Sequence, residues 1–150
     1  METQAYTDAL VSHAMTPGLF SKVNQHEPKS APDNGLTAAI WFRTLRPDQQ
    51  NSGLDATSVW LVMMLRIYLP MLTQPQDMID ERILRAVDVL LGLYSGDFTL
   101  DGMIREVDLL GASGLGLSAE SGYLDIDKAK MRVVDITIPL GINNAWTQGA

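Results

Sequence analysis

The sequence predicts an α+β fold, in which an antiparallel or mixed β-sheet of about five strands carries two main helices on one face. Two observations support this fold class. Apolar residues recur at helical spacing over residues 3–15 and 75–94, and extended apolar runs lie between and after these segments. The resulting order is helix, two strands, helix, three strands. The chain has no internal repeat and no shift in composition, so residues 1–150 are expected to form a single domain.

The first half of the predicted sheet follows the first helix. Residues 24–36 are rich in Pro, Asn and Gly and predict a loop. Residues 37–45 then predict a strand with bulky apolar side chains at its centre. Residues 46–56 form a polar loop that is longer than a hairpin needs. We expect this loop to be mobile in the free protein and to become ordered on assembly.

The strongest predicted strand covers residues 57–69, and both of its faces are largely apolar. A strand of this kind needs cover on both sides. Helices in a small α+β domain usually cover one face only. The second cover is therefore either another subunit or the chain's own termini and loops, and the sequence leaves both open.

Three more strands are expected after the second helix, over residues 102–112, 116–126 and 131–142. Residues 127–129 predict the turn that joins the last two. Because proline cannot donate a backbone hydrogen bond to a sheet, Pro139 indicates that the final strand lies at an edge or ends nearby.

Composition and charge exclude several classes of protein. The net charge of -7, with only 11 scattered basic residues, argues against nucleic-acid binding, which depends on Lys and Arg neutralising phosphates. The absence of cysteine excludes disulfides, thiolate metal sites and cysteine nucleophiles. No basic targeting region precedes the first helix. The longest apolar run, residues 59–72, is too short to span a bilayer, so no membrane partner is expected.

The chemistry-bearing residue types form no recognisable site. His13 and His26 are the only histidines, and no Gly-x-Ser-x-Gly motif accompanies them. Residues 125–127 resemble the start of a calcium loop but lack its glycine and its closing glutamate. The glycine-rich residues 111–116 lack the Lys and Ser/Thr of a phosphate loop, and they predict a bend between strands. We therefore predict no catalytic, cofactor-binding or metal-ligating residue.

Candidate partner-contacting residues come from aromatic and arginine side chains, which are common at the centres of interfaces. Trp60 shares a strand face with Arg66 and Tyr68, and Trp146 lies in a polar tail. Arginines in these segments could pair with acids on a neighbouring subunit. The candidates are Arg43, Arg46, Trp60, Met64, Arg66, Tyr68 and Trp146.

Several stretches carry more information than composition. They are GLFSKVNQHEP, APDNGLTAAIWF, LYSGDFTLDG, VDLLGA and GYLDIDKAKMRVVDITIPLGINNAW, which begin at residues 18, 31, 93, 107 and 122. Together they resemble the tail-terminator proteins of long-tailed, siphovirus-type bacteriophages that infect actinobacteria. The resemblance covers most of the chain, but it contains no short functional motif that could be transferred residue by residue.

The resemblance implies a lambda-type tail-terminator fold and a homo-hexameric ring at the head-proximal end of the tail tube. Such a ring stops polymerisation of the tail tube protein and offers a docking surface to the head-completion proteins. DNA would pass through its channel without sequence-specific binding. The expected location is the virion neck, after assembly in the host cytoplasm.

Three alternatives stay open at this point. The first is another neck or tail component, either a head-completion protein or a tube-like subunit. The second is a small enzyme that uses carboxylates such as Asp125, Asp127 and Asp135. The third is a monomeric binding module.

Overall fold

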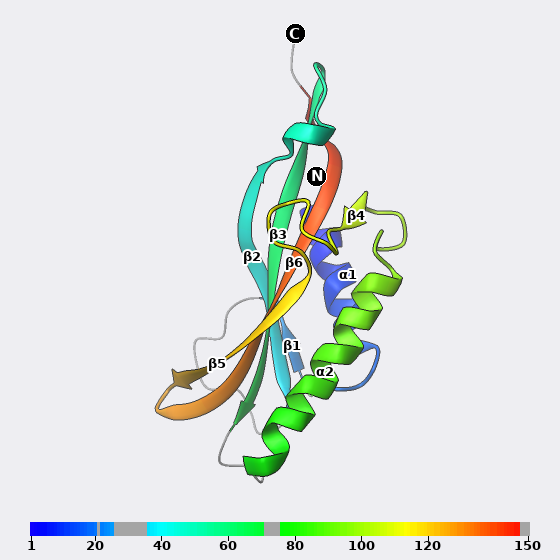
Figure 1. Cartoon of the computed structure of the whole chain (residues 1–150). Helices are drawn as coiled ribbons and strands as arrows, with labels where there is room; N and C mark the ends of the chain where they lie inside the picture. Colours follow the sequence, from blue (N-terminus) through cyan, green and yellow to red (C-terminus); the bar gives the residue numbers. More distant parts are fainter. Residues whose placement is uncertain (21, 26–35, 71–75, 148–150) are drawn as a thin grey trace.

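The computed structural model describes residues 1–20, 22–25, 36–70 and 76–147, and it confirms the α+β fold class (Figure 1). The predicted loop over residues 24–36 lies mostly outside the described part of the chain. The elements in chain order are α1 (Thr3–Met15), β1 (Lys22–Asn24), β2 (Thr37–Pro47), the 3-10 turn η1 (Gln49–Asn51), β3 (Ala56–Pro70), α2 (Gln76–Gly96), β4 (Glu106–Val107), β5 (Ser118–Ile126) and β6 (Ala129–Thr147).

The sheet is mixed and is built around its two longest strands, β3 and β6. Its order is β1-β2-β3-β6-β4, and β5 also pairs with β6. Among the strand pairs of the described residues, β1–β2 is the only parallel one. The outer edge of β6 is shared, because β5 pairs with its first half and β4 pairs with Leu140 and Gly141 further along.

Both helices pack on the same face of this sheet, which we call the first face. Tyr6 and Leu10 of α1 and Leu90 of α2 are buried against alternate residues of the long strands. The hydroxyl of Tyr94 on α2 donates a 2.9 Å hydrogen bond to the carbonyl oxygen of Leu10 on α1, which joins the helices inside the core. The predicted helix-covered face is therefore confirmed.

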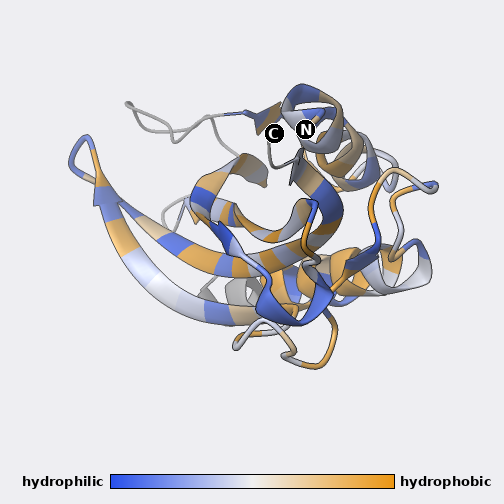
Figure 2. Cartoon of the chain, turned by 90° about the horizontal axis from the view of Figure 1, so that it is seen from above, coloured by the Kyte–Doolittle hydropathy of each residue, from blue (hydrophilic) through white to orange (hydrophobic). Residues whose placement is uncertain are grey.

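The opposite, second face is covered by the chain itself. The sheet curls strongly, as the view from above shows (Figure 2). The curl helps to form a smaller cluster of Ala39, Tyr68, Met131 and Val133, against which Leu124 of β5 also packs. The sequence left open whether another subunit or the chain's own termini and loops cover this face. In the described residues, strands and loops of the chain itself cover it.

Pro139 lies inside β6, opposite Val62 of β3, and the strand continues to Thr147. The prediction that the last strand is an edge strand or ends near Pro139 is therefore wrong. The carbonyl oxygen of Pro139 accepts the backbone N–H of Asp108 at 2.9 Å, so the backbone of residue 139 faces away from β3. Residue 139 lies between the part of β6 that pairs with β5 and the part that pairs with β4. The N–H that proline lacks is therefore not needed for a hydrogen bond between paired strands.

The predicted strand over residues 102–112 is also largely wrong, because only Glu106–Val107 pair with β6. Leu100, Asp101 and Gly102 have φ of 48°, 57° and 82°, a left-handed run that no strand contains. By contrast, the predicted turn between the last two strands is confirmed. Asp127 and Lys128 both have positive φ, as a two-residue hairpin turn of type I′ requires.

The predicted loop over residues 46–56 is shorter than expected, since β2 continues to Pro47 and η1 follows. Hydrogen bonds between this loop and Ser58 of β3 hold it together. The Ser58 backbone N–H donates to Ser52 Oγ at 3.0 Å, and Ser58 Oγ donates to the Asn51 carbonyl at 2.8 Å. These bonds favour an ordered loop in the free chain, and the expected change in mobility on assembly stays a prediction.

Candidate functional site

The structure divides the seven predicted contact residues into two groups. Trp60, Met64 and Tyr68 are buried within the chain, and Trp60 is only 4% exposed. Arg43, Arg46 and Trp146 are exposed, and Arg66 lies between these extremes. Burial does not decide whether the first three touch a partner. Of the seven candidates, Arg43, Arg46 and Trp146 are the ones whose side chains are accessible on the surface of the described chain.

Residues 104–117, which we call the covering segment, and the loop after β2 enclose Trp60. The guanidinium carbon of Arg105 lies 4.9 Å from the centre of the Trp60 ring. Gly141 on the adjacent strand makes this contact possible. A Cβ at Gly141 would come within 2.9 Å of Trp60 Cζ3 and would overlap the Arg105 guanidinium.

Arg105 also links three segments through hydrogen bonds. Its Nη2 donates to Asp48 Oδ2 at 2.8 Å, and its Nη1 donates to Asn143 Oδ1 at 2.6 Å. The buried Asp48 carboxylate also accepts the backbone N–H of Gln50 at 3.2 Å and the Asn51 amide at 2.7 Å. The arrangement ties the loop after β2 to β6 and to the covering segment.

Asp108 gives the covering segment its shape. Its carboxylate accepts backbone N–H groups from Gly111, Ala112 and Ser113 at 2.9, 3.0 and 2.6 Å. Burial raises the pKa of this carboxyl, but the hydrogen bonds from Ser113, Gly111 and Ala112 outweigh it, so the pKa lies below its usual value. The segment turns Leu110 outward, with 98% of its surface exposed.

Arg66 pairs with an acid inside the chain, and the expectation that it also pairs with an acid on a neighbouring subunit stays a prediction. Its Nη2 donates to Asp135 Oδ2 at 3.0 Å, across the β3–β6 register, and its Nε also donates to that carboxylate. The guanidinium carbon lies 5.3 Å from the centre of the Trp41 ring. The hydrogen bond to Asp135 raises the pKa of Arg66 further, so the guanidinium stays charged.

The remaining candidates are exposed at one end of the sheet or along it. Arg43 has a 3.5 Å contact with Thr137 Oγ1, and an Nη of Arg46 lies near Gly114. Trp146, near the end of β6, pairs in register with Thr57 at the start of β3. Leu54, in the turn between β2 and β3, is 91% exposed. The sequence analysis missed Leu54, although an apolar residue in a polar turn was the available signal.

Several strand edges have no strand beside them within the described residues, among them long edges of β2 and β5. β1 pairs with β2 only at residues 37–39, which leaves residues 40–47 of β2 without a neighbour on that side. The outer edge of β5 is likewise unpaired in the described part of the chain. Unpaired edges of this length offer rows of backbone donors and acceptors to another chain.

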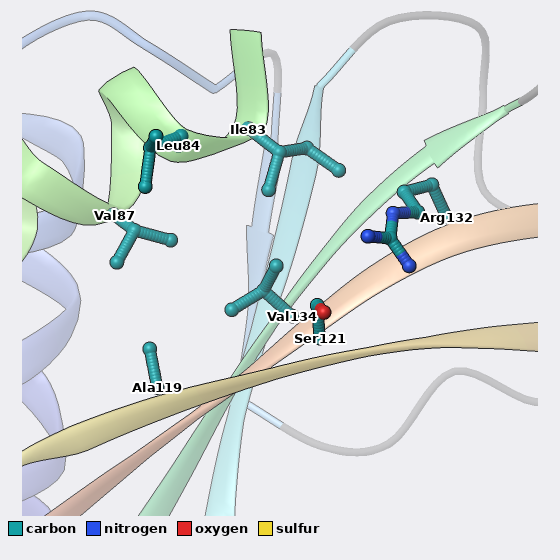
Figure 3. Close-up of a pocket in the computed structure, with 7 residues that line it drawn as sticks. All are labelled: Ile83, Leu84, Val87, Ala119, Ser121, Arg132 and Val134. Atoms are coloured by element: carbon teal, nitrogen blue, oxygen red, sulfur yellow. The ribbon is translucent and has the colours of Figure 1, made fainter. Parts of the chain in front are cut away.

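A groove of about 350 Å³ lies between α2 and the β5–β6 hairpin (Figure 3). Ile83, Leu84 and Val87 line its helical side, and Val134 continues its apolar surface on β6. Arg132 adds a guanidinium at one end. The groove therefore combines an apolar surface with one positive charge.

The carboxylates named as a possible catalytic set do not meet in one place. Asp125 lies opposite Lys130, Asp127 occupies the hairpin turn, and Asp135 pairs with Arg66. Within the described residues, no cluster of three or more His, Cys, Asp or Glu side chains could hold a metal ion.

His13, on α1, contacts residues at the end of α2. Its Nε2 lies 2.8 Å from Asp97 Oδ2, and its ring stacks on Tyr94. The backbone N–H of Asp101 and then the His13 contact hold the pKa of Asp97 below its usual value. These contacts tie α1 to the end of α2.

Comparison with known proteins does not extend this description. In the part of the chain that the structure describes, no helix is both long and apolar enough to cross a membrane. No protein-family model matches the sequence, and no curated protein matches it.

Proposed function

We propose that this chain is the tail terminator of a long-tailed bacteriophage, a structural subunit that closes into a ring on the head-proximal end of the tail tube. The ring would stop tube growth and receive the head-completion proteins. The proposed identity rests on the resemblance of the quoted sequence stretches to tail-terminator proteins. The geometric observation that supports it best is the open sheet, with unpaired edges along β2 and β5 in the described residues.

An open, curled sheet suits a subunit that other subunits complete. Long unpaired edges favour association, and soluble monomers usually shorten, cover or charge them. Several apolar side chains are exposed as well, among them Leu54, Leu110 and Phe42. A head-to-tail contact between different surfaces of identical subunits produces a closed ring when its rotation closes.

Charge supports a role around DNA without tight binding to it. Six copies would carry 6 × -7 = -42 formal charges, so a channel through the ring would offer few sites for phosphate. The same charge makes the copies repel one another. Subunit contacts are therefore expected where acids are absent or where basic residues gather.

The test is the solution mass of the purified protein over a range of concentrations, by light scattering, with negative-stain images of the same samples. We expect closed rings of one size, alone or after addition of tail tube protein, and tubes that stop growing when capped. Unlimited polymers would instead indicate a tube-like subunit. A chain that stays monomeric with tube protein present would overturn the proposal.

A further inference from the structure

His13, near the end of α1, directs both nitrogens of its ring at oxygen atoms that accept hydrogen bonds. Nδ1 lies 3.0 Å from the carbonyl oxygen of Ala9 on the same helix, and Nε2 lies 2.8 Å from Asp97 Oδ2. A carbonyl oxygen and an ionised carboxylate can accept a hydrogen bond but cannot donate one. Both contacts therefore need a ring that carries a proton on each nitrogen.

The Asp97 carboxylate is held in its ionised form. The backbone N–H of Asp101 donates to Oδ1 at 2.9 Å and lowers the pKa of Asp97, and the His13 contact lowers it further. At neutral pH, Oδ2 is thus an acceptor only. A neutral imidazole has one N–H and one bare nitrogen, so it satisfies either Ala9 or Asp97 and leaves its bare nitrogen facing an oxygen lone pair.

Two further features of the site favour a positively charged ring. His13 lies in the last turn of α1, where the partial negative charge of the helix end attracts cations. Its ring also stacks on the Tyr94 ring, with the two centres 5.9 Å apart, and an aromatic face at such a distance attracts a cation. Burial raises the pKa of Tyr94, so its hydroxyl stays neutral.

The titratable side chains that face His13 are Tyr94 of α2 and Asp97 just after it. The acid of α1 itself, Asp8, accepts hydrogen bonds from two glutamine side chains instead. β1 and β2 also pack against α1, and none of their charged residues contacts His13 in the part of the chain that the structure describes. These residues are Lys22, Arg43 and Arg46.

We propose that the contact between α1 and the end of α2 is a proton-dependent joint. It is complete when both ring nitrogens of His13 carry a proton, and it loses one of its two hydrogen bonds when the ring becomes neutral. An imidazole gains and loses that proton between about pH 5 and pH 8. The joint is therefore complete at the acidic end of this range and weakens as pH rises. It lies within one subunit and does not depend on the proposed ring.

The joint reaches beyond the two helices through Asp97. Its carboxylate also holds the N–H of Asp101, which belongs to the left-handed run that precedes the covering segment. Phe98, next to Asp97, accepts the N–H of Val107 at its carbonyl, so the connection continues into the covering segment. Loss of the His13 proton is expected to loosen residues 97–101 together with the last turn of α1.

The first test compares the native protein with His13→Phe, which keeps a ring against Tyr94 and lacks both nitrogens. Chemical denaturation at pH 5.5 and pH 8.5 gives the ratio of their folding equilibrium constants. Because the pair is partly exposed, we expect this ratio to fall by only about fivefold as pH rises. His26→Gln, which removes the chain's other histidine, is the matched control and should show the same fall. A ratio that does not change with pH, or a fall that disappears in His26→Gln, overturns the proposal.

The second test separates the two-acceptor contact from a general effect of the helix end. Asn at position 97 can donate its amide N–H to a bare Nε2, so Asp97→Asn satisfies the neutral ring as well. Measured against the same variant with His13→Phe added, its pH dependence is expected to shrink to less than half of the native value. A full-sized pH dependence in Asp97→Asn overturns the contact.

A third measurement does not rely on unfolding. In NMR spectra of the native protein, the amide signals of Ala9 and Asp101 are expected to move with one midpoint between pH 5.5 and pH 8.5. In His13→Phe both signals should stay in place. Signals that do not move in the native protein, or that move equally in the variant, overturn the proposal.

Discussion

The two faces of the sheet are covered in different ways. On the first face, two amphipathic helices bury a continuous apolar surface. On the second face, a turn-rich segment and the curled β5–β6 hairpin do the covering, held by Arg105–Asp48 and Arg66–Asp135. The partners in these two pairs are 57 and 69 residues apart in sequence. The first face therefore depends on periodicity and the second on a few specific long-range contacts.

The difference implies that the two faces contribute unequally to the stability of the fold. Apolar burial on the first face supplies most of the free energy of folding, because it removes the larger apolar area from water. The cluster on the second face holds fewer buried apolar residues, so a change on that face is expected to cost less stability.

Adjacent residues of β3 test this comparison directly. Leu65 faces the helices at 0% exposure, and Met64 faces the other way at 8%. Leu65→Ala is expected to lower the free energy of unfolding by about 4 kcal/mol, because the helices hold the cavity open. Met64→Ala is expected to cost about 2 kcal/mol, the low end of the same range. Chemical denaturation with unchanged m-values measures both.

An equal loss from the two substitutions would remove the distinction, and a larger loss from Met64→Ala would reverse it. Leu110→Ala serves as the control, since its side chain is almost fully exposed. Its effect is expected to stay within about 0.5 kcal/mol.

The ion pair between Asp48 and Arg105 is the next largest expected effect. Asp48→Ala leaves a largely buried guanidinium without its closest carboxylate, so a loss of about 3 kcal/mol is expected. Adding Arg105→Ala should cost less than the sum of the two single changes, because the stranded charge is gone. Denaturation of the four proteins in this cycle gives the coupling energy.

Asp55→Ala, at an exposed acid in the same hairpin, is the matched control and should change stability within about 0.5 kcal/mol. Additive losses in the cycle would mean that Arg105 and Asp48 act independently. The second face would then depend on packing around Trp60 rather than on the pair.

The success of sequence reasoning follows the same division. Helical spacing at Leu90 and its neighbours, and the doubly apolar strand β3, predicted the first face and the order of its elements. Leu109 and Leu110 suggested a strand, because nothing local shows that the Asp108 carboxylate captures three N–H groups and turns the chain. The prediction at Pro139 was wrong because a strand tolerates a proline where no neighbouring strand needs its N–H. That condition depends on which strands pair on either side of residue 139. The groove has no local signature in the sequence, whereas Leu54 had one that was overlooked, an apolar residue in a polar turn.

Asp108 provides the smallest and most local test of the second face. Its folded-state pKa is lowered, so its contribution to stability is present above the unfolded pKa of about 3.9. That contribution is lost as pH falls through the folded pKa. Asp108→Asn, which removes the charge and adds donors that face other donors, is expected to cost about 1–2 kcal/mol near neutral pH.

The measurement is the free energy of unfolding of both proteins from pH 2 to pH 7, with hydrogen exchange at residues 111–113 as the local readout. The difference in the free energy of unfolding between the native protein and Asp108→Asn should narrow as pH falls. Protonation then removes the charge of the native carboxyl, and the variant lacks this charge at every pH. Exchange at Gly111, Ala112 and Ser113 should be faster in the variant, whereas Leu90 in α2 should keep its protection. A gap that is constant across this range, with unchanged exchange in the segment, would mean that the Asp108 hydrogen bonds do not hold the covering segment in place.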